Sequence, residues 1–170
     1  MLNSENISYI CTHKAIIMNL SEHLSLAEVI KSDTAKRYGI DNHPTSEHLY
    51  NLKLLAETIF EPIRKHFNVP IYISSGYRSK ELNIKLKGVK SSQHLTGEAL
   101  DIDMDGTDLY NIDVFMFIKD NLPFDQLISE FPVNGNPSWI HVSFKVSGKQ
   151  RHQIMYSKKV NNNTVYVSCK

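Results

Sequence analysis

The chain has 170 residues, of which 41% are hydrophobic and 22% are charged, a composition that supports a folded core and excludes an intrinsically disordered protein. Its 19 Lys and Arg residues and 18 Asp and Glu residues give a formal net charge of +1, which is too small to predict binding to nucleic acid. The sequence also lacks the roughly 20 consecutive apolar residues of a transmembrane helix, so we expect no membrane insertion.

The first 17 residues show no clear periodicity. We expect residues 1–17 to form a loosely ordered extension and residues 18–170 to form a single domain, with Met18 as a candidate second start. The polar opening of the chain does not resemble a secretory signal peptide. The two cysteines, Cys11 and Cys169, lie near opposite ends and predict neither a disulfide framework nor a CxxC metal site. Any metal site is therefore expected to use histidines and carboxylates.

Helix signals dominate the first half of the chain. Ser25 and Glu28 have the spacing of a capping box and predict a short helix that begins after Ser25. After residues 44–46, apolar residues recur at steps of three and four as far as Phe67, which predicts the main helix. Pro62 lies late in this pattern and is expected to kink or end the regular helix, because proline has no amide hydrogen.

Strand signals follow mostly in the second half. Ser79 is a candidate N-cap for a helix over residues 80–86, and Thr107 for a helix that extends through Lys119. Since helices precede most strands, we predict an α+β fold with a mostly antiparallel sheet and helices packed on one face. The asparagine run at 161–163 is expected to be a loop, and the expected strands cover residues 71–75, 100–104, 126–131, 139–145, 153–156 and 164–168.

Two of these strands carry reactive side chains on their polar faces. Side chains alternate along a strand, so Asp101 points away from the core face that holds Leu100 and Ile102. By the same argument, His141 lies on the polar face of the strand WIHVSF. If the two strands are neighbours in the sheet, Asp101 and His141 converge on one point.

A third candidate ligand comes from the segment that precedes Asp101. His94 lies seven positions before it, and Gly97 lets the chain turn between the two. Zinc in catalytic sites typically takes three protein ligands of the histidine and carboxylate type and keeps a fourth position for water. His94, Asp101 and His141 supply such a set.

These residues also resemble a known family. Its signature Ser-x-His-x-x-Gly-x-Ala-x-Asp, found in the zinc D-Ala-D-Ala carboxypeptidase-like metallopeptidases of bacterial peptidoglycan, is reproduced by Ser92, His94, Gly97, Ala99 and Asp101. The family's Ser-Gly-Tyr-Arg-Ser element is present upstream at residues 75–79, and its Trp-x-His strand downstream at residues 139–141. The resemblance covers the chain from Met18 to about Phe144 and implies a fold of the hedgehog and D-Ala-D-Ala peptidase type.

The resemblance implies a Zn²⁺ ion held by His94, Asp101 and His141. It also implies that a metal-bound water attacks the amide carbonyl, and that Arg78 stabilises the oxyanion that develops. Arg78 could instead form a structural salt bridge with Asp101 or Asp103.

The general base is less easily assigned. Many members of the family place Glu or Asp three residues before the last histidine ligand, but this chain has Ser138 there, which cannot accept the proton. We predict that Glu130, at the end of the preceding strand QLISE, takes this role, with Asp103 and Glu98 as weaker candidates. If none of them reaches the metal-bound water, the protein would bind zinc and hydrolyse slowly or not at all.

Several nearby residues also have ordinary explanations. Ser92 and Gln93 are expected to form a loop and could hydrogen-bond a ligand, whereas Tyr77 and Trp139 either line a cleft or pack. The other histidines have no partner at a metal spacing and are expected to be surface or helix residues: His13, His23, His43, His48, His66 and His152.

We therefore expect a monomeric zinc metallopeptidase that hydrolyses peptidoglycan stem peptides as a carboxypeptidase or endopeptidase. The alternative is a non-catalytic, zinc-containing peptidoglycan-binding module. Since no signal peptide is visible, we expect synthesis in the cytoplasm and action on the cell wall after release, as in phage lysis.

Overall fold

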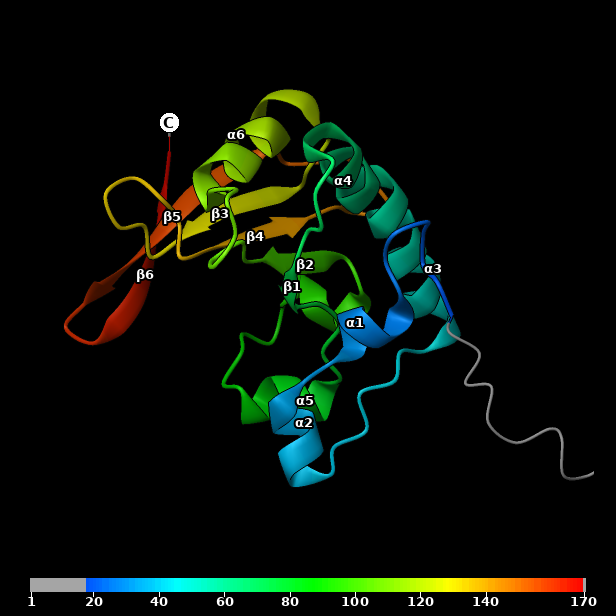
Figure 1. The fold of residues 1–170 in the computed structure, drawn as a ribbon. Coiled ribbons are helices and arrows are strands. Elements are labelled where there is room, and N and C mark those ends of the chain that lie inside the picture. Colours follow the sequence, from blue (N-terminus) through cyan, green and yellow to red (C-terminus); the bar gives the residue numbers. More distant parts are fainter. Residues whose placement is uncertain (1–17, 170) are drawn as a thin grey trace, which may run out of the picture.

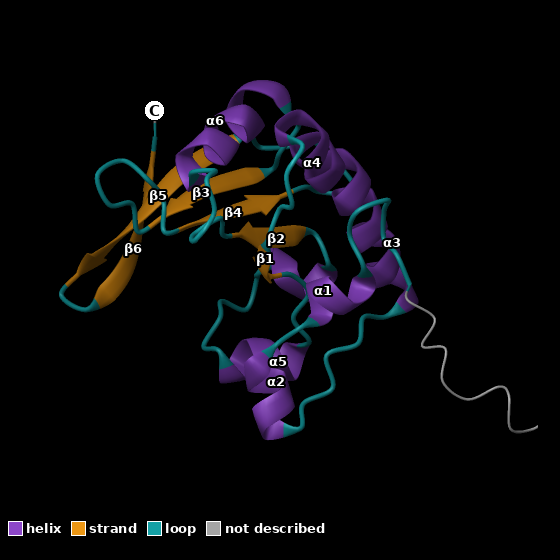
Figure 2. Ribbon diagram, in the orientation of Figure 1, coloured by secondary structure: helices purple, strands orange, loops and turns teal. Residues whose placement is uncertain are grey.

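The computed structural model describes residues 18–169, and the extension predicted over residues 1–17, with Cys11 and His13, lies outside the described residues. Figure 1 shows the order of the elements along the chain, and Figure 2 their type. None of the described helices is long and apolar enough to cross a membrane. The elements are α1 (Leu26–Ile30), α2 (Asp33–Tyr38), α3 (Ser46–Leu55), η2 (Ala56–Phe60), α4 (Glu61–Phe67), β1 (Ile73–Ser75), α5 (Lys80–Lys85), η3 (Gln93–Thr96), β2 (Ala99–Ile102), α6 (Asn111–Asn121), β3 (Gln126–Glu130), β4 (Trp139–Ser143), β5 (Gln153–Val160) and β6 (Asn163–Ser168).

The six strands form one mixed sheet in the order β1-β2-β4-β3-β5-β6 (Figure 1). The pairings β1–β2, β2–β4, β4–β3 and β5–β6 are antiparallel, whereas β3 and β5 are parallel. The parallel pair arises because the loop 144–152 crosses the start of β3, where Gln126 pairs with both Ser143 and Gln153. The predicted α+β class is confirmed, with a sheet that is mixed.

One face of the sheet packs on helices. Leu100 and Ile102 of β2 and Ile140 and Val142 of β4 are almost completely buried in a core that also contains side chains of α3, η2, α4 and α6. These helices lie along the same side of the sheet in Figure 2. The opposite face of β2 and β4 is therefore left for the polar residues between these apolar ones.

The main helix follows its prediction except near Pro62. Thr45 caps its start by accepting a hydrogen bond from the amide of His48 at 3.2 Å. The helix does not end at Pro62; instead, one π-helical turn, η2, precedes α4, in which the proline occupies the first turn. The helix continues through this point, and the wider π-helical turn before Pro62, in which the Glu61 amide bonds the Ala56 carbonyl, accommodates a residue that has no amide hydrogen.

Other boundaries differ from those predicted. The helix expected to begin at Thr107 begins at Asn111, because the Thr107 hydroxyl donates to the Met104 carbonyl at 2.8 Å and closes a turn instead. Helix α2 was not predicted, since Ala35 is its one buried residue and gives no apolar periodicity. The capping box of Ser25 and the short helix α1 are confirmed.

The C-terminal hairpin is longer than the sequence pattern indicated. Strand β5 extends to Val160, beyond the expected residues 153–156, and Asn163 already belongs to β6. The turn consists of Asn161 and Asn162, both with positive φ values of 49° and 63°. Asparagine tolerates this left-handed conformation, which two-residue hairpin turns require.

Candidate metal centre and cleft

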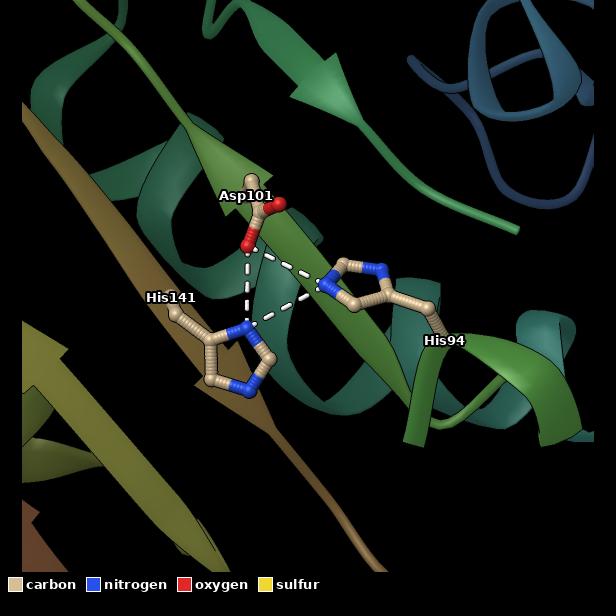
Figure 3. A group of neighbouring side chains, drawn as sticks. All are labelled: His94, Asp101 and His141. Atoms are coloured by element: carbon tan, nitrogen blue, oxygen red, sulfur yellow. Dashed lines mark hydrogen bonds and ion pairs between the residues drawn. The ribbon is translucent and has the colours of Figure 1, made fainter. Parts of the chain in front are cut away.

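His94, Asp101 and His141 converge on one point (Figure 3). Asp101 of β2 lies directly opposite His141 of β4 in the antiparallel register, and His94 lies in η3, just before β2. Asp101 Oδ1 is 2.9 Å from His141 Nδ1 and 3.2 Å from His94 Nε2, and the two nitrogens are 3.2 Å apart. The convergence expected from strand alternation and the Gly97 turn is therefore found.

Two close backbone approaches hold His94 in place. Gly97 has a φ of +75°, and a Cβ atom there would lie 2.6 Å from the carbonyl oxygen of His48 in α3. On the other side, His94 Nδ1 lies 2.6 Å from the carbonyl oxygen of Gly76. Gly76 itself has no room for a side chain, since a Cβ would lie 2.4 Å from Val29 Cγ1. Glycine at these two positions thus allows η3 and the turn after β1 to enclose the imidazole.

We expect Gly97→Ala to lower the free energy of unfolding by about 2–5 kcal/mol, from the left-handed backbone together with overpacking against α3. Gly106→Ala is the matched control, because Gly106 also has a positive φ (+82°) but nothing lies within 4 Å of its Cβ position. The control should cost only the backbone share, about 1–2 kcal/mol. Denaturant unfolding of both variants measures the difference, and equal losses would contradict close packing at Gly97.

The protonation of His94 follows from its contacts. A backbone carbonyl only accepts hydrogen bonds, so Nδ1 of His94 carries a proton and donates it to Gly76. Burial lowers the pKa of His94, which favours the neutral ring with a bare Nε2. Burial works against ionisation of Asp101, but the two histidines outweigh it and hold the pKa of Asp101 well below its usual range. Nε2, the ring nitrogen that is not committed to Gly76, therefore faces the Asp101 carboxylate at 3.2 Å.

An imidazole nitrogen and a carboxylate oxygen at this distance are joined either by a shared proton or by a metal ion. A tetrahedral zinc ion with ligand bonds of about 2.0–2.2 Å separates its ligand atoms by about 3.4 Å. The spacings of 2.9–3.2 Å in this group are close to that value. A backbone carbonyl that orients a metal-ligating histidine through its second nitrogen is also a common feature of zinc sites. The residues present therefore fit a zinc ion.

Arg78 forms one of the two salt bridges considered from the sequence. Its Nη2 donates to Asp101 Oδ2 at 2.6 Å, and its Nε donates to the Ser75 hydroxyl at 2.9 Å. The contact fixes the carboxylate so that Oδ1 faces the two histidines. Arg78 also lines the cleft beside the group. Because a guanidinium has five N–H donors, these two bonds leave others for a ligand.

The cleft in front of His94, Asp101 and His141 has a volume of about 600 Å³. It is lined by most of the loop at residues 87–93, by strands β3 and β4, and by the β5–β6 hairpin. Arg78 and Trp139 contribute to its walls, whereas Tyr77 is buried in the core and packs, with its hydroxyl 3.2 Å from His48 Nδ1.

Glu130 lies on the same face as His141. In the β3–β4 register Ile128 is opposite His141 and Glu130 is opposite Trp139, so Glu130 is the diagonal neighbour of His141. Its side chain lines the cleft but is largely buried, and burial raises its pKa. A carboxyl group in such a position is suited to exchange protons with a bound ligand.

The other candidate bases are occupied elsewhere. Both oxygens of Glu98 accept structural hydrogen bonds, from the Val146 amide and the Thr96 hydroxyl, each at 2.9 Å. Asp103 lies beyond the end of β2 and accepts from the amide of Asp105 at 3.0 Å. Among the described residues, Asp101 and Glu130 are the carboxylates that line the cleft.

The sequence analysis missed an ion pair beside the cleft, between exposed Arg151 and buried Asp125. Arg151 Nε lies 3.0 and 2.9 Å from the two carboxylate oxygens of Asp125, which is completely buried. A further nitrogen of Arg151 donates to Gln93 Oε1 at 3.3 Å, and both Arg151 and Gln93 line the cleft. The pair depends on the parallel neighbours β3 and β5, and no sequence pattern indicated that pairing.

One histidine contradicts its prediction. His23 was expected to have no partner at a metal spacing, but the fold brings it to Glu61 and near Glu22. The Glu61 carboxylate accepts the His23 amide at 2.8 Å and lies 2.9 Å from His23 Nδ1. Glu61 is 38 positions away in sequence, so spacing could not reveal the contact. Its carboxylate is satisfied by these bonds and joins the loop before α1 to α4.

Comparison with known proteins agrees with the geometry. No curated protein matches the chain. The family model described as Peptidase M15 matches residues 22–143, a range that contains η3, β2, β3 and β4 and therefore every residue of the convergent group. The chain belongs to the Peptidase M15 family of zinc D-Ala-D-Ala carboxypeptidase-like metallopeptidases.

Proposed function

We propose that the protein is a zinc-dependent hydrolase of peptide bonds in bacterial peptidoglycan, acting on stem peptides as a carboxypeptidase or endopeptidase. We further propose that residues 18–170 form one metallopeptidase domain of the hedgehog and D-Ala-D-Ala peptidase type. The observation that carries the proposal is the convergence of His94 Nε2, Asp101 Oδ1 and His141 Nδ1, which lie 2.9–3.2 Å from one another. Two imidazoles and one carboxylate are a donor set typical of catalytic zinc.

When bound, zinc supplies a Lewis acid that polarises the scissile carbonyl and lowers the pKa of water. The chain's own residues then have distinct tasks. Arg78 is fixed by Ser75 and Asp101, and its remaining N–H donors stabilise negative charge that develops on the carbonyl oxygen. Glu130 accepts a proton from the attacking water and later delivers it to the leaving amine.

The walls of the cleft support a peptide substrate that carries carboxylates. Lys87 and Arg151 line it together with Arg78, so cationic groups outnumber the carboxylates of Asp101 and Glu130 there. Stem peptides present both free carboxylates and short apolar side chains. Electrostatic complementarity would orient such a ligand along the cleft.

The test is digestion of purified peptidoglycan, with mass spectrometry of the released muropeptides to identify the cleaved bond. We expect cleavage that stops in the presence of a chelator and returns when zinc is added. A zinc-loaded protein that binds peptidoglycan but cleaves no stem peptide would contradict the proposal. It would favour the non-catalytic binding module, for which the serine at position 138 is the supporting observation.

A further inference from the structure

We propose that Ser157 of β5 is a positioning residue that holds Glu130 in the orientation needed for proton transfer. The inference rests on the proposed function, in which Glu130 is the general base. It assigns part of the active site to the C-terminal hairpin, which lies outside residues 22–143 that the family model matches.

The contacts of Ser157 determine the direction of its hydroxyl proton. The side chain is completely buried, and its Oγ accepts the amide hydrogen of Phe131 at 2.9 Å. The same oxygen donates to Oε2 of Glu130 in a short hydrogen bond. A serine hydroxyl has one proton, and the Phe131 amide can only donate. The proton of Ser157 is therefore committed to the Glu130 carboxylate.

The consequence for Glu130 is a side chain fixed at one oxygen. Oε2 is bound by Ser157, the Tyr166 hydroxyl also interacts with the carboxyl group, and the side chain lines the cleft. The next residue, Phe131, has a φ of 44°, which is a left-handed conformation. The hydrogen bond from its backbone amide to the Ser157 hydroxyl helps to maintain this conformation. Backbone and carboxylate are thus held by one hydroxyl group, which reduces the rotamer freedom that a glutamate otherwise keeps.

The hydroxyl also favours the charged form of the base. Burial raises the pKa of Glu130, and the hydrogen bond from Ser157 lowers it. The other groups that act on this carboxyl are His141 on β4, Asp101 on β2 and Tyr166 on β6. Tyr166 is directly opposite Ser157 in the β5–β6 register and lines the cleft, so the hairpin contributes a wall as well as the positioning contact.

The experiment compares Ser157→Ala with Ser168→Ala, an exposed serine on the same hairpin. For Ser157→Ala we expect kcat on a defined stem peptide to fall about 10- to 100-fold, the usual loss when a partner that orients a functional group is removed. KM and zinc content should remain parental. The acidic limb of the kcat profile should move to higher pH, because the carboxylate loses a donor that stabilises its charge. Ser168→Ala should match the parent in all four measurements.

Ser157→Cys guards against misfolding, since it nearly preserves the side-chain volume and replaces the hydroxyl with a weaker donor. We expect an intermediate kcat and an intermediate shift of the acidic limb. Parental kcat and pH profile in zinc-loaded Ser157→Ala would overturn the inference, as would an equal loss at every pH with an unmoved acidic limb. Parental activity in Glu130→Gln would instead remove the base from the proposed function, so the two failures are distinguishable.

Discussion

Replacing Asp101 with asparagine should abolish zinc binding and, with it, hydrolysis. The substitution removes the one negative charge among the three convergent side chains and leaves the guanidinium of Arg78 without its partner. Even groups that only orient metal ligands are worth about 10- to 100-fold in affinity or activity, so loss of a ligand should exceed about 100-fold. Zinc content after gel filtration and cleavage of a stem peptide measure both effects.

Asp103→Asn is the matched control for this prediction. It makes the same chemical change two residues further along, on a carboxylate that lies outside the cleft and accepts the amide of Asp105 at 3.0 Å. We expect it to retain one zinc ion per chain and parental rates. Retention of zinc by Asp101→Asn would show that the metal is held elsewhere and would remove the basis of the proposed mechanism.

Glu130→Gln should lower kcat by about 100- to 10,000-fold while the protein keeps its zinc. The amide has nearly the same shape as the carboxyl group, but it cannot accept the proton of the attacking water. The proposed zinc ligands are untouched, since Glu130 lies on β3 and is not one of the three convergent residues His94, Asp101 and His141. Single-turnover kinetics together with zinc analysis would separate loss of chemistry from loss of metal.

Glu98→Gln provides the comparison, because both oxygens of Glu98 accept structural hydrogen bonds and the side chain lies outside the cleft. Its effect should be confined to stability, with kcat near the parental value for the folded fraction. If Glu130→Gln and Glu98→Gln had the same kcat, proton transfer would have to be assigned to another group.

The convergence of His94, Asp101 and His141, referred to here as the triad, could be predicted because it depends on strand alternation and on one local turn. Alternation along a strand placed Asp101 and His141 on polar faces, between residues that are now seen in the core. The turn at Gly97 then had to bring His94 back over the start of β2. What remained open was whether β2 and β4 are neighbours, and the register shows Asp101 directly opposite His141.

The surroundings of the triad could not be predicted in this way. The loop 144–152 passes the start of β3 and places β5 parallel to it. This pairing brings Ser157 into contact with Glu130, and Arg151 into contact with Asp125. Such a pairing is non-local and leaves no periodic trace in either strand. The start of α6 was missed for the opposite reason: Thr107 is a good cap in isolation, but the local turn uses its hydroxyl.

Strand β2 contributes to both the core and the cleft. Leu100 and Ile102 pack in the apolar core, and Asp101, which lies between them in the sequence, points to the opposite face and lines the cleft. A one-residue slip of this strand would turn a carboxylate inward and two aliphatic chains outward. A misaligned chain would therefore lose both the packing of its core and the convergence of His94, Asp101 and His141. At the proposed zinc site, only the correctly aligned sheet would gain the free energy of coordination, so zinc binding would favour the correct register.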